Sequence, residues 1–343
     1  MNRSQTTLNE SGRRHGAPRL ASVTFCLLVV AGCGADADGG ATTEPAPSGP
    51  AATEATTTES VAEPTTTPAV DPADPLVGRG DVELVAEGFV FTEGPQWMSD
   101  AGVLVFTDID GIYQLAAGDV VTPYRKPSNE ANGLAVDPQG RLLAAERATR
   151  RVTRTESDGT VTPIAERFEG ALLNQPNDIA VRSDGTIYFT DPLYADYPAE
   201  LDFRGVFRIA PDGNLTAERR GATTEAPNGI ALSPDERRLY VANWADDLVW
   251  VFDVAADGSL SEARTFAATA DGPDGMAVDQ AGNLFVTTAS GIEAFGPDGR
   301  LWGIIPVPRT PANVAFGGSD GRTLYITAED RLFRVTLAHP GPA

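Results

Sequence analysis

One short phrase recurs six times from residue 93 onward. Each copy opens with an acid or an asparagine, continues with a small residue and an apolar run, and reaches a turn and a second β-rich run. The opening residues lie 39, 45, 51, 46 and 39 residues apart; they are Glu93, Asn132, Asn177, Asn228, Asp274 and Asn313. Four-stranded propeller blades repeat about every 40–45 residues. The repeat therefore predicts an all-β fold, a six-bladed β-propeller, over residues 76–343.

The last repeat is too short for a complete blade. Only 30 residues follow Asn313, which is enough for three strands. The β-rich segment 82–86 precedes the first repeat and is free to supply the missing outer strand. An N-terminal strand that closes the ring would also remove an exposed sheet edge.

Charge and residue usage exclude several classes of function. The net charge is −22 and Lys126 is the only lysine, so nucleic acid is not an expected partner. The two histidines, His15 and His339, lie in the leader and in the tail, which excludes histidine triads and histidine-rich zinc sites. Catalysis must depend on carboxylates, amides, hydroxyls or a metal bound by oxygen ligands.

The N-terminal segment resembles the signal peptide of a bacterial lipoprotein. Arginines precede an apolar run over residues 21–31 that is too short to span a bilayer, and the run ends in Val30-Ala31-Gly32-Cys33. We interpret residues 1–32 as a lipoprotein signal peptide and Cys33 as the lipidated residue; an ordinary secretory signal is the alternative. The protein is then exported and lipid-anchored to the outer face of the cell membrane, with no other membrane contact.

Residues 33–75 separate this signal from the repeats. They are rich in Thr, Ala and Pro and carry eight acids but no Lys or Arg. Such a composition buries too little apolar surface to offset the entropy of ordering. We expect a disordered acidic tether.

The six opening residues predict a metal site. The innermost strands of a propeller line its central channel, so equivalent positions form a ring around the axis. Two carboxylates and four amides supply hard oxygen ligands of the kind that Ca²⁺ prefers. A single Asx residue would more simply cap a turn, but six in phase favour a site for one divalent cation.

Ordered motifs resemble the SMP-30/gluconolactonase/luciferin-regenerating-enzyme family over residues 82–335. They are Glu93-Gly94-Pro95-Gln96-Trp97, Asn174-Gln175-Pro176-Asn177-Asp178, Thr190-Asp191-Pro192, Pro227-Asn228-Gly229, Pro273-Asp274-Gly275-Met276 and Asn313-Val314-Ala315-Phe316-Gly317-Gly318. The resemblance implies a six-bladed propeller with one catalytic divalent cation, commonly calcium, that hydrolyses sugar lactones or related esters.

The same resemblance implies roles for individual residues. The metal ligands would be Glu93, Asn177, Asn228 and Asp274, and Asp274 would also be the general base. Asn132 would contact the substrate. Calcium is the expected ion, with Mg²⁺, Mn²⁺ or Zn²⁺ as alternatives. One departure is Asn243, where family members often carry Asp.

Two other functions remain open from the sequence. The same site could hydrolyse a phosphotriester or fluorophosphate, since a cation activates P=O as it activates C=O. Alternatively, the propeller could be a non-catalytic surface module that binds a ligand through its loops. The favoured interpretation is a metal-dependent lactonase or esterase that acts as a monomer on a small-molecule lactone or ester.

Overall fold

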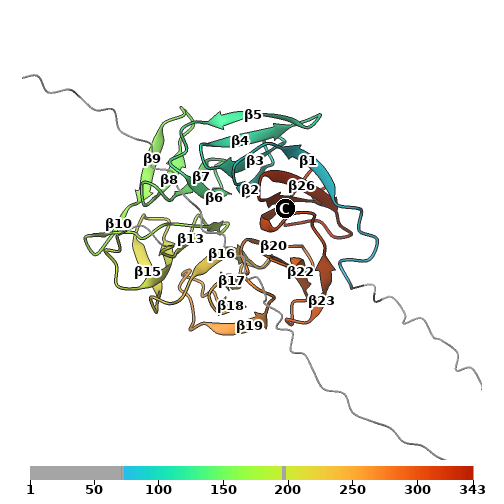
Figure 1. The fold of residues 1–343 in the computed structure, drawn as a ribbon. Helices are drawn as coiled ribbons and strands as arrows, with labels where there is room; N and C mark the ends of the chain where they lie inside the picture. The colour runs from blue at the N-terminus through green and yellow to red at the C-terminus, as the bar shows by residue number, and fades with distance from the viewer. Residues whose placement is uncertain (1–70, 72, 195–197, 343) are drawn as a thin grey trace, which may run out of the picture. The chain divides into compact units, whose positions relative to one another are not determined.

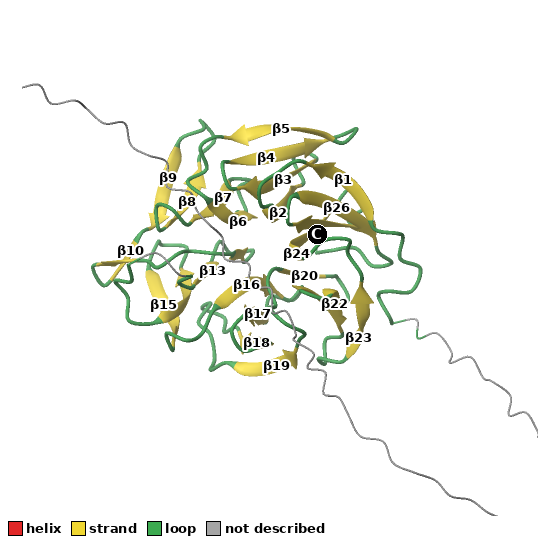
Figure 2. Ribbon diagram, in the orientation of Figure 1, coloured by secondary structure: helices red, strands yellow, loops and turns green. Residues whose placement is uncertain are grey.

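The computed structural model describes residues 71, 73–194 and 198–342. Their regular secondary structure is entirely β (Figure 2). The predicted signal peptide 1–32, Cys33 and the tether as far as residue 70 lie outside the described residues and stay predictions. Within the described ranges, no helix has the length and apolar character needed to cross a membrane.

Six four-stranded antiparallel sheets surround a common centre as blades (Figure 1). Blade 1 contains β2 (Glu93–Met98), β3 (Val103–Asp108), β4 (Gly111–Ala116) and β5 (Val120–Arg125). Blade 2 contains β6 (Ala131–Val136), β7 (Leu142–Glu146), β8 (Arg151–Thr155) and β9 (Val161–Ala165). Blade 3 contains β12 (Ile179–Val181), β13 (Ile187–Asp191), β14 (Arg204–Ile209) and β15 (Leu215–Gly221), and the short hairpin β10 (Arg167–Phe168) and β11 (Ala171–Leu172) precedes it.

The remaining blades repeat the same order. Blade 4 contains β16 (Pro227–Leu232), β17 (Arg238–Asn243), β18 (Leu248–Asp253) and β19 (Arg264–Ala268). Blade 5 contains β20 (Met276–Val278), β21 (Leu284–Thr288), β22 (Gly291–Phe295) and β23 (Leu301–Ile305). Blade 6 contains β24 (Pro311–Gly317), β25 (Thr323–Ala328), β26 (Arg331–Thr336) and the N-terminal β1 (Glu83–Glu87). The predicted six-bladed propeller is confirmed.

The N-terminal strand closes blade 6, as predicted. β1 pairs antiparallel with β26, with Glu83 opposite Arg334, so the two ends of the described body lie side by side (Figure 1). Just beyond β1, the Thr92 hydroxyl donates to the carbonyl oxygens of Glu329 and Arg331 at 3.1 and 2.9 Å. The closure therefore joins strands from both ends of the chain and covers an edge that blade 6 would otherwise expose.

The hydrophobic core lies between neighbouring blades. Strands alternate their side chains between the two faces of a sheet, so each blade presents an apolar face to the blade on either side. Phe285 of blade 5, for example, belongs to one buried cluster with Leu324 and Phe333 of blade 6. The stack of blades consequently fixes the radial position of every innermost strand.

A glycine after the opening residue lets the innermost strands approach closely. A Cβ atom at Gly94 would lie 2.0 Å from the carbonyl oxygen of Asn132 in blade 2. At Gly229 it would lie 2.2 Å from the carbonyl oxygen of Asp274 in blade 5. Real Cβ contacts are never this short, so only glycine fits. This contact explains why a polar residue followed by glycine recurs in the sequence.

Candidate functional site

The six opening residues meet at one end of the central channel. Each lies at the start of the innermost strand of its blade or just before it. Asp274 is half-buried, and the other five are buried: Glu93, Asn132, Asn177, Asn228 and Asn313. The structure therefore brings together every residue that the sequence analysis placed in the ring.

Hydrogen bonds between blades hold the ring in place. The Gly133 amide donates to the carbonyl oxygen of Asn177 at 2.7 Å. The Thr190 hydroxyl donates to the carbonyl oxygen of Asn228 at 2.7 Å. Across the closure, Asn313 Nδ2 donates to Glu93 Oε2 at 3.1 Å. The ring is thus positioned by backbone and side-chain contacts that cross from blade to blade.

Three carboxyl groups crowd this end of the channel. Burial raises the pKa of Glu93 above its ordinary value, although hydrogen bonds from Gly94 and Asn313 oppose the effect. Burial, followed by the charges of Glu93 and Asp178, raises the pKa of Asp274 well above its usual range. Burial and the Glu93 charge raise the pKa of Asp178 to about 7. Such crowding disfavours the ionised forms unless a positive charge is close.

The ring residues fit a divalent cation. Asn228 Oδ1 is buried and has no hydrogen-bond partner, an expensive state for an amide oxygen. Together with Glu93, Asn177 and Asp274 it offers the oxygen ligands that calcium prefers. Within the described ranges, no group of three or more His, Cys, Asp or Glu side chains could hold a metal. The candidate ligand set therefore depends on amide oxygens beside two carboxylates.

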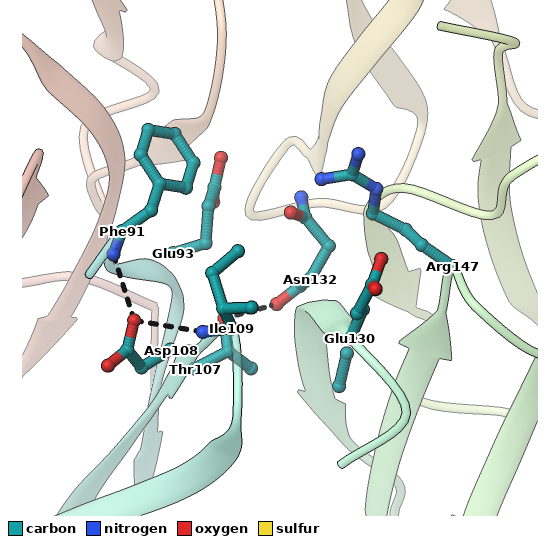
Figure 3. A pocket seen from close by; sticks show the side chains of 9 residues that line it. Phe91, Glu93, Thr107, Asp108, Ile109, Glu130, Asn132 and Arg147 are labelled. Carbon is teal, nitrogen blue, oxygen red and sulfur yellow. Dashed lines mark hydrogen bonds between the residues drawn. The ribbon is translucent and has the colours of Figure 1, made fainter. Parts of the chain in front are cut away.

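A pocket opens beside the ring, and Figure 3 shows it from close by. Glu93 and Asn132 line it together. Asp108 Oδ1 accepts the Phe91 and Ile109 amide N–H groups, both at 2.8 Å, and so fixes two apolar side chains in the wall. The pocket thus joins an apolar wall to polar groups near the channel axis.

Asp178 is a site residue to which the sequence analysis gave no role. It stands where four other copies carry the glycine. Its carboxylate accepts the Ile179 and Ile230 amides at 2.9 and 3.2 Å. It also lines a second cavity of about 360 Å³ between the innermost strands. The signal for it was the change from glycine to Asp at the position after Asn177.

Arg147 and Tyr194 were not identified from the sequence either. Arg147 lines the pocket, and its Nε is buried without a hydrogen-bond partner. The Tyr194 hydroxyl is also buried without a hydrogen-bond partner, and burial and the nearby Asp274 charge raise its pKa. Both residues lie on connections between second and third strands of blades. These connections differ in length and sequence, so the repeat could not reveal them.

Asn243, where the sequence departs from the family pattern, has structural partners. Its Oδ1 accepts the Ala226 amide at 3.0 Å, and its Nδ2 donates to Asp246 at 2.5 Å. The side chain thereby holds the segment that leads into β16 and Asn228. The departure leaves the ring intact.

Residues 91–330 match the SMP-30/gluconolactonase/LRE-like region. A gluconolactonase of Zymomonas mobilis subsp. mobilis (strain ATCC 31821 / ZM4 / CP4) is 32% identical over 289 residues, which cover 74% of this chain and 80% of the relative. A 6-deoxy-6-sulfogluconolactonase of Pseudomonas putida is 31% identical, covering 71% and 85%. The solved structure of a gluconolactonase from Xanthomonas campestris superposes with a TM-score of 0.72 at 32% identity, covering 77% of this chain and 91% of that chain.

Proposed function

The chain belongs to the SMP-30/gluconolactonase/LRE-like family, and on this basis we propose that it is a calcium-dependent hydrolase of sugar lactones. The observation that carries the metal dependence is the unpartnered, buried Oδ1 of Asn228 beside three crowded carboxyl groups. A dication would satisfy the amide oxygen and lower the cost of ionising the carboxylates.

Glu93, Asn177, Asn228 and Asp274 would hold the ion. When bound, the ion supplies Lewis-acid polarisation of the lactone carbonyl and stabilises negative charge on its oxygen. Asp274 takes a proton from a water molecule as that water attacks the carbonyl carbon. The bond from this carbon to the ring oxygen then breaks, and the proton passes to the released oxygen. The product is the open-chain hydroxy acid.

Asn132 and the apolar wall complete the proposed site. The Asn132 amide lines the pocket beside Glu93 and offers both a donor and an acceptor to the hydroxyl groups of a sugar. Phe91 and Ile109 offer apolar surface for the carbon face of the ring. The lactonase relatives favour a carbon ester over a phosphotriester as the substrate.

Metal removal followed by substrate comparison tests this function. The protein is treated with a chelator, and hydrolysis of a lactone panel and of one phosphotriester is measured before and after addition of Ca²⁺, Mg²⁺, Mn²⁺ or Zn²⁺. We expect chelation to abolish lactone hydrolysis and calcium to restore it. Calcium at about 100 times its Kd should add roughly 2.7 kcal/mol of stability. Full activity in the metal-free protein contradicts the metal dependence, and faster phosphotriester hydrolysis contradicts the substrate class.

We further propose that the mature protein is lipid-anchored at Cys33 on the outer face of the cell membrane. The proposal is supported by the Val30-Ala31-Gly32-Cys33 sequence at the end of a short apolar run. A lipid of this kind adds about 0.8 kcal/mol of membrane affinity per buried CH₂ group. Cys33→Ser should release the protein from the membrane fraction and abolish its detergent-phase partitioning. Identical fractionation of variant and wild type contradicts the anchor.

A further inference from the structure

Arg147 has a buried side-chain donor without an acceptor. Among the described residues, no hydrogen-bond acceptor faces its buried Nε, although the carboxylates of Glu93 and Asp274 lie close enough to interact with its charge. An unpaired buried donor is energetically costly, and more so when it carries charge. Such a cost is commonly found where a ligand completes the site.

The other arginines around Arg147 in blade 2 show that pairing is the local rule. Arg141 pairs with Asp137 at 2.7 Å, and Arg154 pairs with Glu156 at 2.8 Å. Arg151 pairs with Glu146 at 2.9 Å, and Arg150 Nε donates to the Leu173 carbonyl oxygen at 2.6 Å. Blade 2 therefore supplies carboxylates or carbonyls to these four arginines, whereas Arg147 lines the pocket and its Nε has no acceptor.

Arg147 lies beside the residues proposed to bind the cation and the substrate. It lines the same pocket as Glu93 and Asn132, and Figure 3 shows it beyond Asn132, on the side away from Phe91. Its positive charge is felt at Glu93 and Asp274, where it opposes the rise in both pKa values. A substrate with its carbonyl at the ring would therefore extend other substituents toward this guanidinium.

We propose that Arg147 determines specificity by binding an anionic substituent of the lactone, namely a carboxylate. This inference rests on the proposed lactonase function and names its substrate class: a lactone that carries a second acid group. A guanidinium offers parallel N–H donors that match the two oxygens of a carboxylate. A neutral sugar lactone has no anionic group to accept hydrogen bonds from this guanidinium.

Two lactones that differ in charge test the proposal. D-Glucaro-1,4-lactone carries a free carboxylate, whereas D-glucono-1,5-lactone does not. We expect wild type to have the higher kcat/KM for the glucarolactone. Arg147→Gln should lower the ratio of the two kcat/KM values by about 10- to 100-fold, through KM for the charged lactone, because a charge-assisted pair is lost. Arg147→Lys should recover only part of the ratio, since lysine cannot form the bidentate pair.

A matched control removes a positive charge elsewhere in the same blade. Arg154→Gln should keep the wild-type ratio, because Arg154 pairs with Glu156 and does not line the pocket. If Arg147→Gln lowers kcat/KM for both lactones equally, Arg147 only balances the carboxylates of the ring and the proposal is wrong.

A binding measurement separates this proposal from the proposed function. Calorimetric titration of D-glucaro-1,4-lactone into the chelator-treated protein requires no turnover. Weaker binding to Arg147→Gln than to wild type and Arg154→Gln supports the subsite even if no lactone is hydrolysed. Equal binding to all three proteins overturns it.

Discussion

Glu93 and Asp274 are carboxylates of the same ring, but their surroundings differ. Glu93 Oε2 accepts hydrogen bonds from the Gly94 amide at 2.8 Å and from Asn313 Nδ2 at 3.1 Å, which fix its orientation. Asp274 is less buried by surface area, yet burial and, after it, the charges of Glu93 and Asp178 raise its pKa well above the usual range. A fixed carboxylate suits a ligand, and one with a raised pKa suits a base.

Asp274→Asn and Glu93→Gln should therefore have different effects. Asp274→Asn keeps an oxygen ligand but removes the base, so it should retain much of the calcium affinity and lose hydrolysis by roughly 100-fold or more. Glu93→Gln removes a negative ligand, and excess calcium should restore its activity. The measurements are calcium calorimetry and lactone hydrolysis at increasing calcium.

Two results would contradict these roles. If excess calcium rescues Asp274→Asn as fully as Glu93→Gln, Asp274 is a ligand and not the base. If neither variant changes calcium binding, the metal ring itself is wrong.

Asp191 should make stability depend on pH. Burial raises its pKa to about 7, although the Asn174 amide donates to its Oδ2 at 2.8 Å. The folded protein holds the Asp191 carboxyl proton more tightly than the unfolded chain does. The protonated carboxyl therefore contributes its full stabilisation below about pH 4, and this stabilisation is lost as the pH rises through 7. Asp191→Asn stays neutral throughout. The Tm of Asp191→Asn minus the Tm of wild type should therefore be larger at pH 8 than at pH 5, by roughly 5 °C or more.

Differential scanning calorimetry at the two pH values measures this difference. The comparison uses the variant and wild type under identical calcium, so that metal binding does not enter the difference. A Tm difference that stays constant from pH 5 to pH 8 contradicts the raised pKa of Asp191.

At the scale of elements, the spacing of the innermost strands depends on the glycines after the ring residues. In Gly229→Ala, the new Cβ would lie 2.2 Å from the carbonyl oxygen of Asp274, so β16 or the segment before β20 must move. Overpacking of this kind typically costs about 1–3 kcal/mol. We expect that loss of stability together with weaker calcium binding, because Asp274 is displaced.

Gly80→Ala is the matched control for this variant. A Cβ atom there would meet its nearest neighbour, Thr336, at an ordinary 3.7 Å. Thermal unfolding and calcium calorimetry should therefore give wild-type values for Gly80→Ala. Unchanged calcium binding in Gly229→Ala would show that strand spacing does not position Asp274.

At the scale of the whole molecule, ring closure should decide stability. A mature chain that starts at Arg79 loses the packing of Leu76 on the blade 6 core but keeps β1. A chain that starts at Gly88 loses β1 and exposes the edge of β26. We expect a small decrease in Tm for the first chain and a decrease of roughly 10 °C or more for the second. Equal melting temperatures would contradict the role of the closing strand.

The sequence by itself determined the architecture and the ring. Six copies of one local pattern give the period of a blade, the incomplete last copy requires a strand from the N-terminus, and the phase of the copies places Glu93 and Asp274 with four asparagines around one axis. These features follow from the sequence because each depends on short-range periodicity that repetition makes visible.

Only the tertiary structure decided the surroundings of that ring. Three features depend on which blades become neighbours: the unpartnered Nε of Arg147, the unpartnered hydroxyl of Tyr194 and the crowding of Asp178 with Glu93. Arg147 and Tyr194 lie on connections between strands that do not repeat, and Asp178 interrupts the repeated pattern. A pKa, a free donor or a close approach is a property of several chain segments together, and it exists only after the blades have packed.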